Sequence, residues 1–185
     1  MLYHIFVTVC LFWQVSARCE KPAVVENFDM KKYSGKFFVA GLEAKNLLDK
    51  ATFYTASCFS FNKSGENPDP QTNSYELKLA AVNVLPIKVT STFNVVTPSE
   101  GLLRLFYPVR QVYYDDNIIC TDYTSYSVNY ACEDSSLLYG KSVLIFLMVR
   151  DVNEFENIKN LPEVQDCLAR ITSTPANQLK VINNN

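Results

Sequence analysis

The stretch from residue 19 to residue 37, CEKPAVVENFDMKKYSGKF, determines how the rest of this sequence is interpreted. A cysteine opens it, a polar segment typical of a helical turn follows, and Gly35 stands directly before alternating apolar residues. Because glycine adopts backbone conformations that other residues avoid, we expect the chain to change direction there and enter a strand. The stretch therefore predicts a short turn that leads into the first strand of a sheet.

The residues in front of this stretch, MLYHIFVTVCLFWQVSA, contain no Lys, Arg, Asp or Glu. Their apolar run is shorter than a comfortable membrane span, and Val15-Ser16-Ala17 supplies the small residues that signal peptidase requires. The alternative is a buried N-terminal strand, which the abrupt change of composition at Arg18 disfavours. We predict that residues 1–17 are a secretory signal peptide, that residues 18–185 form one domain, and that the protein is extracellular.

Cleavage after Ala17 would remove the only histidine, the only tryptophan and one of the six cysteines. In an oxidising compartment the remaining cysteines are expected to form two disulfides and to leave one thiol. The sequence alone does not say which cysteine is left over. The five that remain are Cys19, Cys58, Cys120, Cys132 and Cys167.

Composition and charge argue against several classes of function. A formal net charge of −2 without a basic patch disfavours nucleic-acid binding, and no later segment is long and apolar enough for a membrane span. Without histidine, the usual Ser-His-Asp, Cys-His and zinc centres are not expected. Asp115 and Asp116 are adjacent on a predicted strand and point to opposite faces, so they cannot share one substrate bond. We predict no catalytic residues, no metal site and no enzymatic activity.

Between residues 36 and 150, short segments rich in β-branched and aromatic residues alternate with turn-forming residues such as those in NKSGENPDPQTNS and DYTS. Such segments predict strands, and their regular spacing favours an antiparallel sandwich or an up-and-down barrel. The eight predicted strands cover residues 36–44, 51–61, 74–84, 87–96, 101–107, 112–122, 125–133 and 142–150.

The last predicted strand is apolar on both alternating faces, so something outside the sheet should cover it. Residues 160–172 are predicted to form that cover as an amphipathic helix, with an Asn-x-x-Glu pattern from Asn160 that resembles a capping box. Residues 177–182 could add a last short strand. The apolar positions of the helix are Val164, Cys167, Leu168 and Ile171.

The opening motif, C-x-x-P-x-V-x-E-N-F-D-x-x-K-Y-x-G-x-F, resembles the N-terminal signature of lipocalins. It is most similar to the branch that contains apolipoprotein D and the insect bilin-binding proteins. The matching residues are Cys19, Pro22, Val24, Glu26, Asn27, Phe28, Asp29, Lys32, Tyr33 and Gly35. A second lipocalin motif, TDYTSYSVNYAC, covers residues 121–132, and a third is the arginine that ends the last predicted strand, Arg150.

This resemblance implies an all-β fold: an eight-stranded antiparallel up-and-down β-barrel with an N-terminal 3-10 turn and one C-terminal α-helix packed outside. It also implies that the turn ENFD closes one end, where Arg150 lies against the aromatic residue of the first strand. That residue is Phe37, at a position where most relatives carry tryptophan. The closed-end residues implied are Asn27, Phe28, Asp29, Gly35, Phe37, Thr121, Asp122, Tyr123 and Arg150.

Strand alternation then nominates residues that line a ligand cavity. If Arg150 points inward, the alternate residues Leu144, Phe146 and Met148 of the last strand point inward too. If Arg104 faces water, its neighbours Leu103 and Leu105 on the fifth strand face inward. Similarity to the family adds residues of the first, sixth and seventh strands. The alternative is that these side chains fill a packed core. The predicted ligand-binding residues are Val39, Leu103, Leu105, Tyr107, Tyr114, Ile118, Tyr126, Val128, Tyr130, Leu144, Phe146 and Met148.

By resemblance, Cys19 pairs with Cys132 and Cys58 pairs with a C-terminal cysteine, for which Cys167 is the candidate. Cys120 is then expected to be a buried free thiol. Asn62 begins an Asn-Lys-Ser sequon in the predicted turn after the second strand and is a candidate glycosylation site.

The resemblance implies a secreted lipocalin that binds a small hydrophobic ligand and carries or sequesters it. The ligand classes are bilin, fatty acid or other lipid, sterol, retinoid and pheromone, and no cofactor is expected beyond such a bound bilin or lipid. The alternative is a lipocalin that binds an extracellular protein partner through loops at the open end, as some salivary anti-haemostatic lipocalins do.

Overall fold

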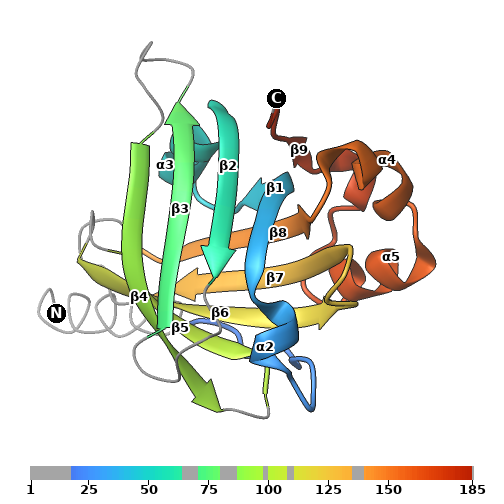
Figure 1. The fold of residues 1–185 in the computed structure, drawn as a ribbon. Helices are drawn as coiled ribbons and strands as arrows, with labels where there is room; N and C mark the ends of the chain where they lie inside the picture. The colour runs from blue at the N-terminus through green and yellow to red at the C-terminus, as the bar shows by residue number, and fades with distance from the viewer. Residues whose placement is uncertain are drawn as a thin grey trace, which may run out of the picture.

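The computed structural model describes residues 18–63, 71–79, 87–97, 100–107, 111–134 and 140–184. The predicted signal peptide, residues 1–17, lies outside this part of the chain. Eight antiparallel strands follow one another around the molecule (Figure 1). They are β1 (Gly35–Ala44), β2 (Ala56–Lys63), β3 (Gln71–Leu79), β4 (Ile87–Thr97), β5 (Leu102–Tyr107), β6 (Val112–Thr121), β7 (Tyr126–Glu133) and β8 (Ser142–Val149).

The strands close into a ring, because each pairs with the next and β1 pairs with both β8 and β2. The pairing of β1 with β2 is short and ends at Phe38, opposite Ser60. Beyond a bulge between Val39 and Gly41, the short strand β9 (Lys180–Val181) pairs with β1 instead. The predicted eight-stranded antiparallel barrel is confirmed.

Asn184 joins β1 and β2 beyond the point where their pairing ends. Its side-chain amide nitrogen donates to the carbonyl oxygen of Val39 at 2.8 Å, and its Oδ1 accepts from the backbone N–H of Phe59 at 2.8 Å. The Asn184 side chain thus links the backbones of β1 and β2 at a level where the two strands do not pair directly.

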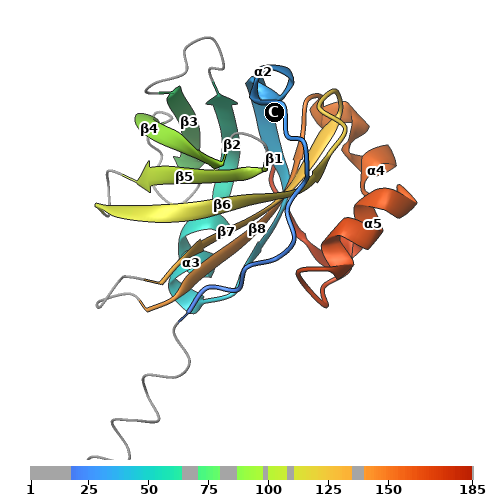
Figure 2. The ribbon, with the colours of Figure 1, turned by 90° about the horizontal axis from the view of Figure 1, so that it is seen from below.

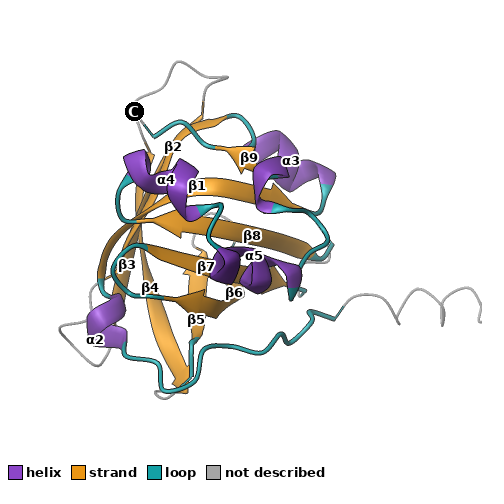
Figure 3. Ribbon diagram, turned by 90° about the vertical axis from the view of Figure 1, so that its right-hand side faces the viewer, coloured by secondary structure: helices purple, strands orange, loops and turns teal. Residues whose placement is uncertain are grey.

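The apolar residues form one cluster inside the barrel and a second outside it. Alternate residues of β8 divide between them: Phe146 and its neighbours at i ± 2 face the interior, whereas Ile145 and Leu147 face outward. The outward side packs under α5 (Pro162–Ala169) through Val164 and Leu168, both almost fully buried. Figures 2 and 3 show α5 outside the barrel wall. The predicted division of the last strand is confirmed.

The C-terminal region contains more helix than the sequence predicted. Before α5 lie η1 (Val152–Glu154) and α4 (Phe155–Ile158), and after it comes η2 (Ala176–Gln178). The predicted capping box is wrong: the N-cap of α5 is Leu161, and Asn160 instead donates its side-chain N–H to the carbonyl oxygen of Glu156. None of the helices formed by the described residues has the length and apolar character needed to cross a lipid bilayer.

Two further predictions of local structure are wrong. The N-terminal turn is a short α-helix, α2 (Met30–Tyr33), rather than a 3-10 turn, and Asp29 caps it by accepting from the N–H of Lys32. Residues 51–55, predicted to start the second strand, belong largely to a helix, α3 (Leu47–Phe53). Asn46 caps this helix by accepting from the N–H of Asp49, so the cap overrides the β-propensity of the residues that follow.

The disulfides agree with one prediction and contradict the other. Cys19 and Cys132 are bridged, with Cα atoms 5.9 Å apart. Cys167 is bridged to Cys120 and not to Cys58, so the expectation of a free thiol at Cys120 is also wrong. Cys167 pairs with Cys120 because α5 packs over β6 and β7, which brings Cys167 to the outer face of β6.

Candidate functional site

A small cavity opens at the end of the barrel where α3 lies, which we call the open end; α2 lies at the opposite, closed end (Figure 1). The cavity has a volume of about 60 Å³ and an almost wholly apolar wall. Helix α3, which connects β1 to β2, contributes Phe53 and covers part of the opening. The lining residues are Phe53, Phe59, Phe61, Leu105, Phe106, Tyr107, Tyr114, Ala131, Leu144 and Phe146.

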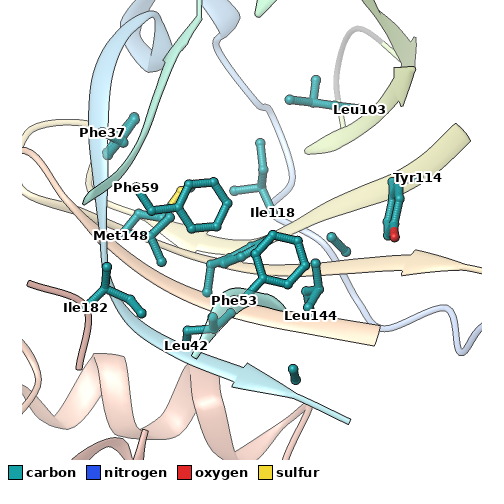
Figure 4. Close-up of a cluster of buried hydrophobic side chains, with 14 of the residues drawn as sticks. Phe37, Leu42, Phe53, Phe59, Leu103, Tyr114, Ile118, Leu144, Met148 and Ile182 are labelled. Carbon is teal, nitrogen blue, oxygen red and sulfur yellow. The ribbon is translucent and has the colours of Figure 1, made fainter. Parts of the chain in front are cut away.

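Aromatic rings occupy much of the space beside the cavity. Phe53 stacks on Phe59 with ring centroids 5.6 Å apart, and Phe146 meets Phe59 and Phe61 edge to face at 5.9 and 5.8 Å. Figure 4 shows Phe53, Phe59, Tyr114 and Leu144 converging from α3, β2, β6 and β8. Ligand pockets commonly have volumes of roughly 300–1,000 Å³, so a ligand larger than one ring would require these side chains to rotate.

A chain of buried hydrogen bonds fastens α3 to the rim of the barrel. The hydroxyl of Tyr114 donates to Ser142 Oγ at 3.0 Å, and Ser142 donates to Asp49 Oδ2 at 2.6 Å. The side chain of Asn46 donates to the same carboxylate oxygen. Asp49 and Ser142 are fully buried, so this network fixes the position of the helix that lies over the cavity.

A second polar network lies inside the barrel, below the cavity. Lys63 Nζ lies 3.0 Å from Asp116 Oδ2, and Asn129 donates its side-chain N–H to Asp116 Oδ1 at 2.9 Å. The hydroxyls of Tyr33 and Ser127 lie 3.0 Å apart beside Asn129. All five side chains are buried. The sequence did not predict this network, because Lys63 lay in a predicted turn and no local pattern connects it with Asp116 on the sixth predicted strand.

The surroundings of Lys63 keep its buried ammonium charged. Burial alone lowers the pKa of Lys63, but the neighbouring carboxylate of Asp116 and the side chain of Tyr33 outweigh it, so the pKa of the ammonium is raised. Burial raises the pKa of the Tyr33 phenol, which therefore stays protonated at neutral pH. The network thus carries one positive and one negative charge that sum to zero.

The closed end has the arrangement that the resemblance implied. The guanidinium of Arg150 lies over the ring of Phe37, 3.6 Å from the ring centroid, and donates to the backbone carbonyl oxygens of Lys36, Tyr33 and Tyr123 at 3.1 Å each. Gly35 makes this approach possible, because it has φ +100° and a Cβ there would lie 3.0 Å from Arg150 Nη1. The prediction that Arg150 packs on Phe37 is confirmed.

The motif around Thr121 forms the turn between β6 and β7 at the same end. Asp122 Oδ1 accepts from the backbone N–H groups of Thr124, Ser125 and Tyr126. Burial raises the pKa of Asp122, but these hydrogen bonds outweigh it and the pKa is lowered. Thr121 donates to the carbonyl oxygen of Tyr126.

The turn ENFD meets this hairpin at the closed end. Tyr123, with φ +66°, accepts from the N–H of Asp29 through its hydroxyl, and its ring lies 6.1 Å from that of Phe28. Asn27 also adopts a positive φ, of 52°. The predicted closed-end residues therefore all lie at that end of the barrel.

The structure divides the predicted ligand-binding residues into three groups. Five line the cavity: Leu105, Tyr107, Tyr114, Leu144 and Phe146. Four face the interior nearer the closed end without lining the cavity: Val39, Leu103, Ile118 and Met148. Three lie outside the barrel, in the cluster under α5: Tyr126, Val128 and Tyr130.

The last group corrects the prediction for the seventh strand. Val128 pairs with Leu147, and Tyr130 pairs with Ile145, so each shares the outer face with its partner. The inward residues of β7 are instead Ser127, Asn129 and Ala131, of which the first two belong to the interior polar network. The assignment made by similarity to the family was wrong for this strand, because the interior is polar at this level and the large apolar residues of β7 pack outside the barrel.

The prediction also missed lining residues on β2 and α3. Phe59 and Phe61 are separated by one residue, so alternation could have placed both on one face of the second strand. Phe53 could not be found this way, because it reaches the cavity from a helix. Asn62, the candidate glycosylation residue, is exposed within β2 rather than in a turn, and Ser64 lies outside the described residues. Within the described ranges, no cluster of His, Cys, Asp and Glu is placed to hold a metal ion.

No family model matches the chain. Bovine (Bos taurus) apolipoprotein D is 29% identical over 117 residues, which cover 62% of this chain and 57% of that protein, less than two thirds of its length. Among solved structures, the cockroach allergen Per a 4 aligns with a TM-score of 0.67 at 17% identity, covering 91% of this chain and 96% of that one.

Two further solved structures share the fold. The amine-binding protein of Rhodnius prolixus, solved with tryptamine, aligns with a TM-score of 0.69 at 15% identity, covering 87% of this chain and 84% of that one. Insecticyanin from the tobacco hornworm Manduca sexta aligns with a TM-score of 0.60 at 14% identity, covering 85% and 82%.

Proposed function

We propose that this chain is a lipocalin near the apolipoprotein D branch, and that it is a secreted, non-enzymatic protein that binds a small hydrophobic ligand in the open-end cavity and carries or sequesters it. The observation that carries the proposal is the cavity itself, whose wall is formed by aromatic and aliphatic side chains from five strands and from α3. An eight-stranded barrel has an interior of the right width for one small ligand.

Burial of apolar ligand surface supplies the driving force, on the order of 25 cal/mol per Å². The rings of Phe53, Phe59 and Phe146 offer edges and faces to an aromatic or aliphatic ligand. The candidate classes are bilin, fatty acid or other lipid, sterol, retinoid and pheromone. Since the Rhodnius protein was solved with tryptamine, small aromatic amines are added to them.

The first experiment is to purify the protein from the medium of secreting cells and to record its absorption spectrum. Extraction and mass spectrometry then identify any lipid that purifies with it, and a visible absorption band would identify a pigment ligand. N-terminal sequencing tests the secretion itself, and we expect the purified chain to start at Arg18. A chain that stays in the cell with residues 1–17 attached would contradict secretion.

The cavity is tested by a substitution that fills it. Ala131 is buried on the wall, and Ala131→Leu adds three carbon atoms to a space of about 60 Å³. We expect at least a tenfold loss of affinity for the neutral fluorescent probe N-phenyl-1-naphthylamine, measured by titration.

The matched control is Ala51→Leu, which makes the same chemical change on the exposed face of α3. Its affinity should equal that of the unsubstituted protein. Equal probe affinity for Ala131→Leu and Ala51→Leu, with both proteins folded, would place binding elsewhere.

Glycosylation at Asn62 is a further proposal, supported by the exposure of this residue on the outer face of β2. Treatment with a glycosidase that removes N-linked glycans should increase the electrophoretic mobility of the secreted protein. The Asn62→Gln variant should migrate like the treated protein, and treatment should not change its mobility.

A second candidate function is recognition of an extracellular protein by the open end. It is favoured by Leu47 and Leu48 on α3, which are 83% and 44% exposed. Two adjacent exposed leucines beside the cavity entrance offer an apolar contact to the surface of another protein. A purified protein that carries no ligand and binds no hydrophobic probe would favour this function over the first.

A further inference from the structure

The ion pair of Lys63 and Asp116 lies directly beneath the cavity. Asp116 follows Tyr114 by two residues on the inner face of β6 and pairs with Ala131 across to β7; both neighbours line the cavity. Lys63 follows Phe61, another lining residue, by two residues on β2, and its Nζ lies 5.9 Å from the centroid of that ring. The pair therefore occupies the next layer of side chains toward the closed end.

Stability alone does not account for this pair. The side chains of Lys63 and Asp116 are 1% and 5% exposed, so both charges have lost their hydration. Burying an ion pair is so unfavourable that apolar residues of similar volume are often equally stable or more stable. The pair also lies where a ligand would end and is held by the neutral residues Tyr33 and Asn129.

We propose that the Lys63–Asp116 pair is the polar floor of the ligand cavity and selects ligands whose buried end carries an uncharged hydrogen-bonding group, a hydroxyl or a carbonyl. This inference rests on the proposed function, because it assigns specificity to the same cavity. The ligand would enter with its polar end first, and its apolar body would lie among the aromatic rings above the floor.

The charge balance of the floor is the reason why the buried end must be neutral. A ligand carboxylate that approached Lys63 would also approach Asp116, and two like charges at short range in a buried site repel strongly. A ligand ammonium would meet the same repulsion from Lys63. Either ion would leave a net charge in an apolar surrounding, which is unfavourable.

A neutral group avoids that repulsion. A carbonyl can accept a hydrogen bond from the ammonium of Lys63, and a hydroxyl can both accept from Lys63 and donate to Asp116. Hydrogen bonds to charged groups are stronger than those between neutral groups. A wholly apolar end would gain neither bond and would cover the charges with hydrocarbon.

The test compares ligands with one apolar body and different ends. The series is 1-octanol, 2-octanone, octane, octanoate and octylammonium, each used to displace N-phenyl-1-naphthylamine from the full protein at neutral pH. We expect 1-octanol and 2-octanone to displace the probe at concentrations at least tenfold lower than the other three. This ranking in the unsubstituted protein is decisive by itself and does not depend on the folding of any variant.

A double variant assigns the preference to the pair. Lys63→Met with Asp116→Leu replaces both charges by apolar side chains of similar size, and we expect octane to bind it as tightly as 1-octanol. The matched control is Arg104→Met with Asp115→Leu, which removes an exposed pair from the outer face of β5 and β6. The control should keep the ranking of the unsubstituted protein.

Infrared spectroscopy gives an independent readout. The carbonyl stretch of bound ¹³C-labelled 2-octanone should lie at lower wavenumber in the unsubstituted protein than in the double variant, because only the first provides a charged donor, the ammonium of Lys63, whose hydrogen bonds are stronger than those of neutral donors. Equal affinities across the series, tightest binding by either ion, or equal carbonyl frequencies would overturn the inference while leaving the carrier function in place. If no member of the series displaces the probe and the probe itself does not bind, the proposed function fails, and the inference fails with it.

Discussion

Gly35 and Arg150 depend on each other at the closed end. The guanidinium of Arg150 reaches three backbone carbonyl oxygens and the ring of Phe37 only because no side chain projects from Gly35. Cation–π stacking on phenylalanine is weaker than on tryptophan. The hydrogen bonds to the carbonyl oxygens add to this weaker contact and hold the guanidinium of Arg150 over the ring of Phe37.

We predict that Gly35→Ala lowers the free energy of unfolding by about 1–3 kcal/mol, because it combines a positive φ with a contact to Arg150. Gly140 is the matched control: it also has a positive φ, of 66°, but a Cβ there meets nothing within 4 Å. Gly140→Ala should therefore show only the backbone effect, about 1 kcal/mol. Urea denaturation measures both, and equal losses would mean that the contact with Arg150 contributes nothing.

Asp122 gives a prediction for the dependence of stability on pH. Its pKa is lowered in the folded protein, so the carboxylate stabilises the fold at pH values above the ordinary range of aspartate, about 3.9. That contribution is lost as the pH falls through the lowered pKa. Between about pH 5 and pH 2, we expect the free energy of unfolding of Asp122→Asn to fall less steeply than that of the unsubstituted protein.

The control for this prediction is Asp166→Asn, on the exposed face of α5. It should reproduce the pH dependence of the unsubstituted protein in the same denaturation series. If Asp122→Asn and the unsubstituted protein have parallel profiles, the three backbone hydrogen bonds do not stabilise the ionised carboxylate.

At the scale of the elements, the helix α5 is fixed to β6 by the Cys120–Cys167 disulfide, which spans 47 residues of sequence. In the chain-entropy account, a bridge of this length stabilises by about 2–4 kcal/mol. We predict that Cys120→Ser lowers the free energy of unfolding by that amount. The control is Cys58→Ser, which leaves the bridges Cys19–Cys132 and Cys120–Cys167 intact and should lower the free energy of unfolding by less than Cys120→Ser does.

Peptide mapping without reduction tests the same assignment directly. It should recover a linked pair of peptides that contain Cys120 and Cys167, and another pair that contains Cys19 and Cys132. A linked pair that contains Cys58 and Cys167 would restore the pairing that the family resemblance implied.

Much of the fold was predictable because alternation and turns are local signals. The inner and outer faces of β8 followed from its sequence, and so did the exposure of Arg104. The seventh strand was assigned to the wrong face because Ser127 and Asn129 face inward, toward a charge pair whose partners are 53 residues apart. No local pattern reports such a pairing, so the polar floor could be found only in three dimensions.

At the scale of the whole molecule, the two ends of the barrel differ in how they are held. The closed end combines Arg150, the hairpin at Asp122 and the aromatic contacts of Tyr33 with Phe28 and Phe37. The open end is held by α3 and its buried hydrogen bonds to Ser142. We therefore expect a ligand to enter at the open end and, within the described part of the chain, to displace α3 and the aromatic rings beneath it.

The bridge that Asn184 makes between β1 and β2 has a consequence for how the barrel is completed. Phe59 and Asn184 are 125 residues apart, and direct pairing of β1 with β2 ends at Phe38. On the ribosome the chain emerges from its N-terminal end, so all eight strands leave the exit tunnel before the residue that joins this seam. The part of the seam beyond Phe38 is thus the last part of the barrel wall that vectorial synthesis allows to form, and a nascent chain would hold its strands together with that part still open.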